Sequence, residues 1–227
     1  MSDSLNQDFT KRVVINTQNE VWHTSPSSGV ERLYLERDNM GEYAKASSIV
    51  KFHPGSKFDN HTHDNGEEIF VLEGTFSDQH GDYTHGTYLR NPHNSDHIPF
   101  SKDGCKILVK LRQFQNGDTV SIVKDTLKSA WLQGLVPGLK VMPLHTFKTE
   151  HAAMVKWEPN TQFNTHKHWG GEEIYVVDGV FYDQFGSYPK GTWIRSPHLS
   201  EHRPFTKNEG ALIFVKTGHL DLSVPMV

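Results

Sequence analysis

The amino-acid sequence predicts an all-β protein built from two tandem copies of one domain, each a β-sandwich or β-barrel. Short apolar runs, such as Ser-Ser-Ile-Val-Lys-Phe and Glu-Ile-Phe-Val-Leu, are separated by turn residues, among them His53-Pro-Gly55, Asp64-Asn-Gly66 and Asn91-Pro92. This punctuation is typical of many short strands. Long segments with an apolar period of 3.6 residues, which would indicate helices, are missing. The second observation is that the chain repeats itself.

The repeat is clearest around a histidine-rich segment. The stretch His61–Gly74 recurs 105 positions later as His166–Gly179. The match runs without a gap from about Val50 to Lys102, and roughly half of its positions are identical, far more than chance gives. Outside this window the match continues at an offset of 109, which a four-residue deletion explains; Trp22 pairs with Trp131, and Gly29 with Gly138.

A repeat of this length indicates two tandem domains rather than a solenoid. We place them at residues 12–113 and 121–218, with the boundary in the polar stretch between them. The segment Lys124–Leu132 is expected to form one short helix.

Four residues of the first copy have the pattern of a metal site. His61 and His63 are two positions apart, so on a strand they point to the same face. Asn65-Gly66 is a hairpin signal that reverses the chain before Glu67. His97 arrives from a later strand or loop. Three imidazoles and one carboxylate suit zinc, iron, manganese or nickel better than calcium or magnesium.

The second copy repeats all four candidate ligands. They are His166, His168, Glu172 and His202. Three other histidines are not repeated: His53, His80 and His85 align with Glu158, Phe185 and Lys190. Since packing gives no reason to retain this set, we predict one divalent metal ion per domain.

These residues match the two motifs of the cupin superfamily. The first motif fits Gly55, His61, His63, Glu67 and Gly74, and the second fits Gly86, Pro92 and His97. The second copy fits at Gly179, Gly191 and Pro197. Three positions depart from the motif where a glycine is usual; they are Asn160, Asn94 and Leu199. Such departures concern turn geometry rather than the ligands.

Longer runs resemble the cupin domain of the anti-sigma factor ChrR. They are Gly-Val-Glu-Arg-Leu, Gly-Glu-Glu-Ile-Phe-Val-Leu-Glu-Gly and Gly-Thr-Tyr-Leu-Arg-Asn-Pro. The resemblance covers nearly the whole chain, twice, and implies two jelly-roll barrels, each with a metal that is zinc in ChrR. ChrR also has a sigma-binding zinc domain with a Cys-x-x-Cys pair. The single cysteine here, Cys105, cannot supply that pair, so we do not expect sigma-factor binding.

Composition narrows the class of protein. The net charge is -4 and there is no Lys/Arg run, so we expect no nucleic-acid partner. No stretch is apolar enough for a membrane helix, and the N-terminal residues lack the core of a secretory signal, so we expect a cytoplasmic protein. Cys105 is expected to be a buried hydrophobe. Edge strands at barrel rims favour a homodimer.

Three functions remain open at this point. The first is a regulatory or sensory module in which a zinc-type site responds to an unknown small molecule. The second is a metal-dependent dioxygenase, in which iron or manganese keeps open positions for substrate and oxygen. The third is a binding protein in which the metals are structural. A tetrahedral zinc with four protein ligands would be closed, so metal identity distinguishes these hypotheses.

Other residues recur in both copies. Arg90 and Arg195 are expected either to bind an anionic substrate or to lie on the surface in salt bridges. Tyr83 and Tyr188 are expected to pack in the barrels, and Glu68 and Glu173 to face away from the ligands. His93 and His198 either orient a ligand or lie on surface loops. Trp169 replaces Asp64, which predicts that the two pockets differ in polarity.

Overall fold

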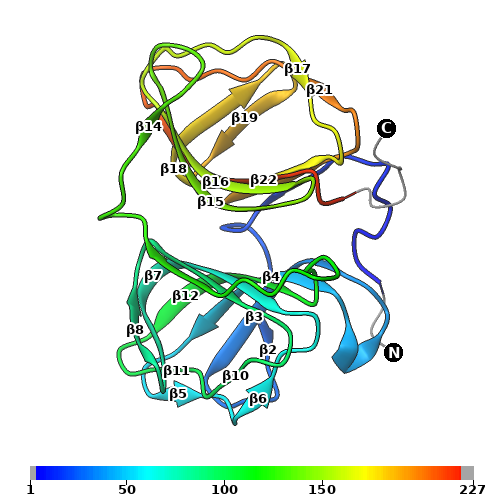
Figure 1. Cartoon of the computed structure of the whole chain (residues 1–227), viewed down its shortest axis with the longest axis vertical. Helices are drawn as coiled ribbons and strands as arrows, with labels where there is room; N and C mark the ends of the chain where they lie inside the picture. The colour runs from blue at the N-terminus through cyan, green and yellow to red at the C-terminus, as the bar shows by residue number, and fades with distance from the viewer. Residues whose placement is uncertain (1–3, 221–227) are drawn as a thin grey trace. The chain divides into compact units, whose positions relative to one another are not determined.

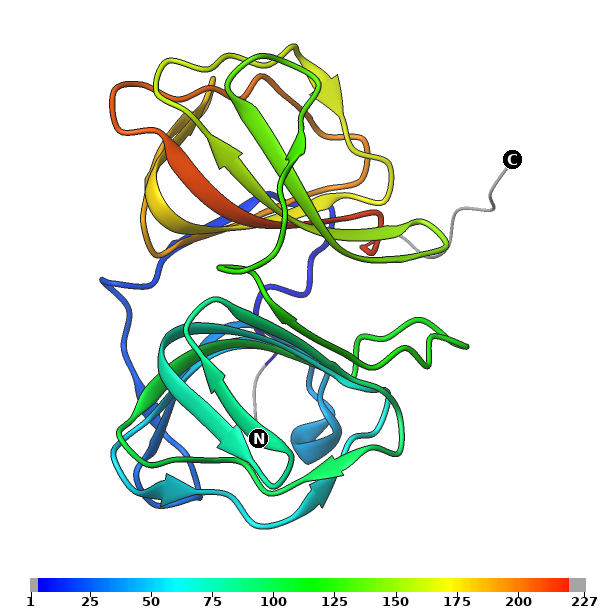
Figure 2. The ribbon, with the colours of Figure 1, turned by 60° about the vertical axis from the view of Figure 1, so that its left-hand side comes forward.

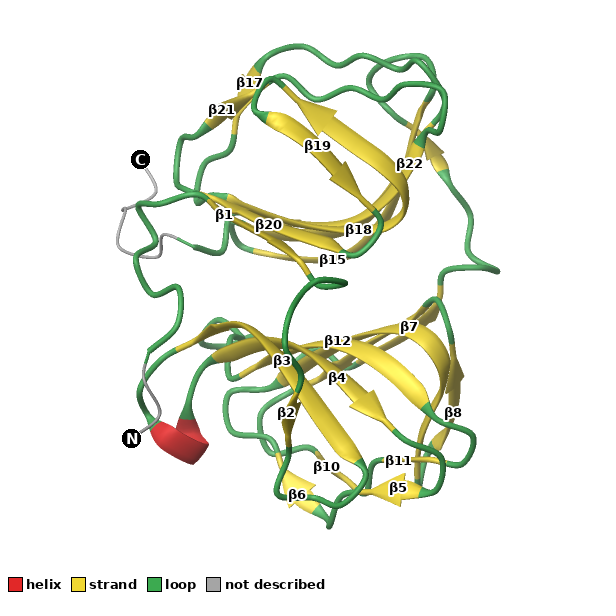
Figure 3. Ribbon diagram, turned by 180° about the vertical axis from the view of Figure 1, so that it is seen from behind, coloured by secondary structure: helices red, strands yellow, loops and turns green. Residues whose placement is uncertain are grey.

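The computed structural model describes residues 4–220, and these form two compact all-β units. The only helical element in that range is the 3₁₀ turn η1 (Gly41–Tyr43). Figure 1 and Figure 3 show the strands of each unit. The all-β prediction is confirmed. Among the described residues, no helix is both long and apolar enough to cross a membrane.

The first unit contains Val21–Lys128 and, of the described N-terminal residues, 4–7. Its larger sheet has the antiparallel order β13-β9-β7-β12-β4-β3-β2. In that order the strands are Ile122–Asp125, Thr87–Asn91, Glu67–Asp78, Cys105–Leu111, Ala46–Phe52, Val30–Arg37 and His23–Thr24.

The opposite layer of the first unit is made of short strands. They are β5 (Ser56–Lys57), β6 (His61–Thr62), β8 (Gly81–Thr84), β10 (Asp96–His97) and β11 (Phe100–Ser101). The long strand β7 joins both layers, because its first half pairs with β9 and β12 and its second half pairs with β8 and β11. In Figure 2 these strands, cyan to green, curl into an open-ended barrel.

The second unit repeats this arrangement. It contains Asp8–Glu20 and the described residues 129–220. Its main sheet has the order β1-β20-β18-β22-β16-β15-β14. In that order the strands are Val13–Asn16, Thr192–Ser196, Glu172–Asp183, Ala211–Thr217, Glu150–Trp157, Leu139–Phe147 and Leu132–Gln133. The remaining strands are β17 (His166–Lys167), β19 (Gly186–Pro189) and β21 (Glu201–His202).

The two units exchange one edge strand each. Strand β1, from the start of the chain, pairs with β20 of the second unit, with Val13 opposite Arg195. Strand β13, which follows the first repeat, pairs with β9 of the first unit, with Ile122 opposite Arg90. The compact units therefore differ from the predicted domains 12–113 and 121–218, which follow the order of the repeat in the sequence.

The short helix predicted at Lys124–Leu132 is absent. Lys124 and Asp125 end β13, and a turn follows in which the Asp125 carboxylate accepts a hydrogen bond from the Leu127 backbone amide at 3.0 Å. The chain then enters β14. Ladder pairing of Ile122–Asp125 with β9 determines the conformation here and overrides any local helix preference.

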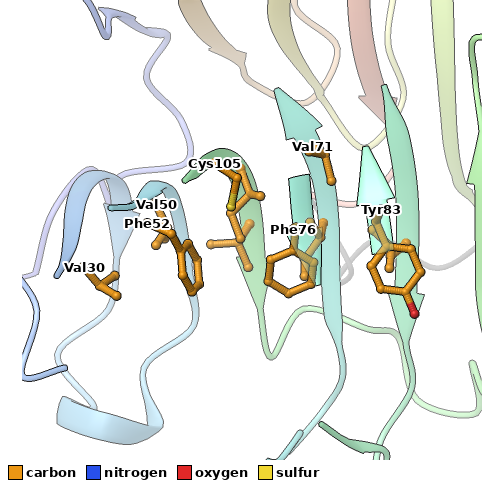
Figure 4. Close-up of a cluster of buried hydrophobic side chains, with 11 residues drawn as sticks. Val30, Val50, Phe52, Val71, Phe76, Tyr83 and Cys105 are labelled. Carbon is orange, nitrogen blue, oxygen red and sulfur yellow. The ribbon is translucent and has the colours of Figure 1, made fainter. Parts of the chain in front are cut away.

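Each barrel encloses an apolar core that leads to the candidate site. In the first, Phe52 and Phe76 meet edge to face with ring centroids 5.8 Å apart, and Phe76 also lies 6.0 Å from the ring of His97. Figure 4 shows this cluster. Cys105 is buried within it, as predicted, and burial raises the pKa of its thiol to about 11.

The residues that replace motif glycines keep the glycine conformation. Asn94 and Leu199 have φ values of 67° and 57°, and Asn160 has 58°. This left-handed region costs an asparagine little but strains a leucine. Leu199 lies in the turn between β20 and β21 of the second barrel, where its amide donates to the His168 carbonyl at 2.9 Å.

Candidate metal centres

The predicted ligands of the first barrel converge because two short strands, β6 and β10, meet the start of the long strand β7. Strands β6 and β10 pair in a register that sets His97 opposite His61. His63 follows β6 directly, and a turn with Asn65 and Gly66 at positive φ, 53° and 76°, reverses the chain. Glu67 is the first residue of β7. The hairpin inferred from the sequence is thus the device that brings the carboxylate to the histidines.

The four side chains form one compact set. One ligand atom from each of His61, His63, Glu67 and His97 lies within 4.8 Å of the other three. The His63 and His97 Nε2 atoms are 3.1 Å apart, and Glu67 Oε2 lies 3.2 Å from His63 Nε2 and 3.4 Å from His97 Nε2. Three nitrogens and an oxygen at this spacing can surround one ion, and the donor set fits a transition metal.

Hydrogen bonds at the far ring nitrogens orient two of the imidazoles. His61 Nδ1 lies 3.0 Å from the Asp59 carbonyl oxygen, and His63 Nδ1 lies 3.0 Å from Ser95 Oγ. With Nδ1 occupied, each ring presents Nε2 to the centre. Metal-binding histidines usually have such a partner, which sets the tautomer.

Asp78 holds the third imidazole. Its Oδ2 lies 3.4 Å from His97 Nδ1, while its Oδ1 accepts from the Tyr83 hydroxyl at 3.1 Å. Burial alone would lower the pKa of His97, but the hydrogen bond and charge of Asp78, together with the charges of Glu67 and Asp96, outweigh burial and raise that pKa. Sequence reasoning missed Asp78, although its repetition as Asp183, on the strand that begins with the ligand glutamate, was a usable signal.

The first centre holds an ionised carboxylate. Burial acts to raise the pKa of Glu67, but hydrogen bonding and charge from His63, the charge of His97 and the Asn91 amide lower it to about 2. Asn91 Nδ2 donates to Glu67 Oε2 at 3.0 Å. Burial lowers the pKa of His61. An anion among imidazoles is the charge state that a divalent cation requires.

The second barrel gathers the same four residue types less tightly. The three histidines His166, His168 and His202 each offer a nitrogen within 4.8 Å of the others. Their Nε2 atoms are 3.0 Å apart for His168 and His202, and 3.1 Å apart for His202 and His166. Glu172 contacts two of them, at 3.2 Å from His168 and 3.6 Å from His202.

The electrostatics of the second centre differ from those of the first. Burial raises the pKa of Glu172 to about 8, and burial lowers the pKa of His168 to about 4 and that of His202 to about 3. Ser196 stands where the first barrel has Asn91, so its side chain does not repeat the amide donor. Asp183, the counterpart of Asp78, is instead paired with Arg12 at 2.8 Å.

The two centres also open onto different cavities. The first cavity has a volume of about 380 Å³ and is lined by all four ligand residues, an apolar wall that includes Phe58 and Val109, and polar residues such as Asn60. The second has about 170 Å³ and a nearly apolar lining that includes Trp157 and Phe163. The predicted difference in polarity is present.

Arg90 and Arg195 do not bind at these sites and do not lie on the surface. Both are fully buried. Arg90 pairs with Asp118 at 2.5 Å and with Glu68 at 3.4 Å, and it stacks on Phe114 at 3.8 Å. The predictions that these arginines bind an anionic substrate or lie on the surface are therefore wrong, although Arg90 does form the expected salt bridges. Glu68 faces away from the ligands, as expected.

The remaining repeated residues support the barrel. Tyr83 and Tyr188 are buried, as predicted, and hydrogen-bond to the repeated aspartates. His93 Nδ1 accepts from the Asn65 amide at 3.2 Å, and His198 Nδ1 accepts from the Gly170 amide at 2.8 Å. These two histidines thus fix the turn between the ligand strands. They contact backbone amides there rather than orienting a ligand imidazole.

The fold is shared with several solved cupin-fold structures. A "putative dioxygenase" of Nostoc punctiforme is 14% identical, with 96% of this chain and 88% of that one covered and a TM-score of 0.76. A "putative glyoxylate induced protein" of Pseudomonas aeruginosa is 14% identical, with coverages of 95% and 91% and a TM-score of 0.72. A deletion mutant of Bacillus subtilis oxalate decarboxylase is 14% identical, with 90% and 76% covered and a TM-score of 0.62. At these identities the likeness concerns the fold alone.

The family is established by sequence. A comparison with curated proteins gave no match. The ChrR cupin-like domain, in contrast, matches twice, at residues 10–115 and 119–221. The chain belongs to the family of ChrR cupin-like domains and carries two of them in tandem.

Proposed function

We propose that the first barrel is a small-molecule site built around a divalent metal ion, and that it works as a metal-dependent dioxygenase. The observation that carries this proposal is the cavity of about 380 Å³ onto which all four ligand residues open. Its volume is at the lower end of the range for small-molecule sites. A metal held only to stabilise the barrel would not need such a space beside it.

The residues of the first centre have two different roles. His61, His63, Glu67 and His97 would hold the ion, and Asp78 and Ser95 keep two of the imidazoles in register. When bound as iron or manganese, the ion would supply redox and Lewis-acid chemistry with positions left open. The apolar wall of the cavity excludes water from an organic substrate.

A sensory role is the second candidate. Four protein ligands would saturate a tetrahedral zinc ion and close the site. The second barrel fits a closed site better than the first does, because its cavity is smaller, at about 170 Å³, and nearly apolar.

We propose that the ion of the second barrel is structural.

The test combines metal analysis with oxygen uptake. The full chain, purified without chelators or a metal-binding tag, is expected to hold one ion per barrel. His61→Ala should lose the first ion alone, and His166→Ala the second alone. In an oxygen electrode with small diketones and phenolic ketones, the wild type and His166→Ala should consume oxygen, and His61→Ala should not.

Two results would contradict parts of this proposal. Full metal content in both single variants would show that the ligands are assigned wrongly. Zinc in both barrels, with no oxygen uptake on any substrate, would favour the sensory function over the dioxygenase.

A further inference from the structure

The two cavities differ at two structurally equivalent positions, and in both the first barrel has an arginine. Arg32 lies opposite Val50 in the β3–β4 ladder, and Val141 lies opposite the equivalent Val155 in the β15–β16 ladder. Both positions line their cavities. The first cavity thus has a cation where the second has a valine.

The second difference lies at the end of the strand that pairs with the ligand glutamate. Strand β12 ends at Leu111, opposite Glu67, and Arg112 follows it. Strand β22 ends at Thr217, opposite Glu172, and Gly218 follows it. Arg112 lines the first cavity. Two positive charges therefore distinguish the first cavity from the second.

Arg32 makes no ion pair with any acidic side chain that the structure describes. Its guanidinium is half-buried and sits over the Phe58 ring at 5.5 Å. Burial lowers the pKa of Arg32, and the nearby Tyr34 and Glu67 oppose this. An arginine remains charged under such conditions. A partly desolvated guanidinium that lines a cavity can bind an anionic group there.

Arg112 is held in a conformation that costs free energy. Its φ is 59°, in the left-handed region where its counterpart Gly218 has 74°. A non-glycine residue there is strained, and such strain is concentrated at functional sites. The described contacts of its guanidinium are weak: one hydrogen bond to the Ala44 carbonyl at 3.5 Å and the Tyr43 ring at 5.7 Å. Its Nε is buried without a hydrogen-bond partner.

We propose that the first cavity selects a small organic carboxylate, whose anionic group pairs with Arg32 and Arg112 while its apolar body packs on the phenylalanine and aliphatic wall beside the metal. Guanidinium groups bind carboxylates through paired, charge-assisted hydrogen bonds. Two acidic residues, Asp59 and Asp64, also line this cavity, but both are exposed and screened by water. This inference rests on the proposed small-molecule site and names its ligand class.

The second barrel supplies the substitutions that test the inference. Arg32→Val and Arg112→Gly install the residues found at the equivalent positions, and the glycine also relieves the positive φ. Calorimetric titration of the metal-loaded full chain would use benzoate, pyruvate and succinate, the neutral amide of each, and inorganic phosphate. At least one carboxylate should bind, and each substitution should weaken it by about 10- to 100-fold, since a charged hydrogen bond is lost. The amides should be unaffected.

Each result has a definite meaning. Carboxylate affinity that is unchanged in both variants, or equal to that of the matching amide, overturns the inference and leaves the small-molecule site standing. Phosphate binding as tightly as the best carboxylate also overturns it, because the cavity would then be a general anion site. If no compound binds while the first ion is present, the proposed function fails together with the inference. Lys102→Ala, which removes an exposed positive charge of the first barrel outside the cavity, is the matched control and should bind the carboxylate as the wild type does.

Discussion

At the scale of single residues, what distinguishes the two centres is the group beyond each ligand. Asp78 contacts His97 in the first barrel, whereas the equivalent Asp183 is engaged by Arg12 and Tyr188. A carboxylate behind a metal-bound imidazole raises its basicity and fixes its orientation. The first centre is therefore the better prepared for a metal ion, although both barrels repeat the same four ligand types.

Replacing this carboxylate should affect one centre only. Asp78→Asn keeps an oxygen for the backbone amides of His80 and Gly81 but removes the charge behind His97. Metal affinity of the first site should fall by about 10- to 100-fold. Competition with a chromophoric chelator measures it, in a His166→Ala background that leaves only the first site. Asp183→Asn, in a His61→Ala background, is the matched control and should change affinity far less; equal losses would contradict the assigned role.

Several residues could be predicted from the sequence, and others could not, for physical reasons. The residues that could hold a metal ion were predictable because their identity and spacing recur in both copies. Arg32 and Arg112 were missed because their signal is a difference between the copies, which a search for repeated residues passes over. Arg90 was misjudged because the sequence does not reveal that Phe114 and Asp118 cover its face of the sheet.

At the scale of elements, the exchanged edge strands could not be assigned from the sequence. Strands β1 and β13 are equivalent in the repeat, and each pairs with an equivalent strand, β20 or β9. Alternation of apolar and polar residues along a strand fits pairing with β9 as well as pairing with β20. Only the three-dimensional structure therefore shows which partner each strand has. The exchange has a chemical consequence, because the residue just before β1 is Arg12, and its guanidinium reaches the buried Asp183.

This contact predicts that the N-terminal strand stabilises the second unit. Arg12→Ala would leave Asp183, with 1% of its side chain exposed, without its cation. Because Arg12 is itself partly exposed, the loss should be about 2 kcal/mol, less than for a fully buried pair. Urea unfolding of the full chain measures it.

The matched control lies at the equivalent place in the other exchanged strand. Ser121 precedes β13 as Arg12 precedes β1, and it is exposed. Ser121→Ala should change the free energy of unfolding by less than about 0.5 kcal/mol. A similar cost for the two substitutions would mean that Asp183 does not depend on Arg12.

At the scale of the whole molecule, duplication has produced two barrels with one ligand pattern and two environments. One centre has an ionised glutamate and a cavity of about 380 Å³, while the other has a glutamate of raised pKa and about 170 Å³. Under the proposed function, one copy binds a small molecule and the other holds its metal ion for stability. The difference lies in the residues around the ligands, since the ligand types are the same.

Removal of the metal ions should therefore lower the stability of the chain by two separate contributions, one from each barrel. An ion that binds only the folded state at 100 times its dissociation constant adds about 2.7 kcal/mol, which corresponds to roughly 10 °C in the melting temperature of a barrel of this size. Calorimetric scans with and without chelator should show this loss for the wild type. His61→Ala and His166→Ala should each retain only the part that belongs to the other barrel, and the double variant should not respond to chelator. A chelator response that persists in the double variant would place a stabilising ion outside these two centres.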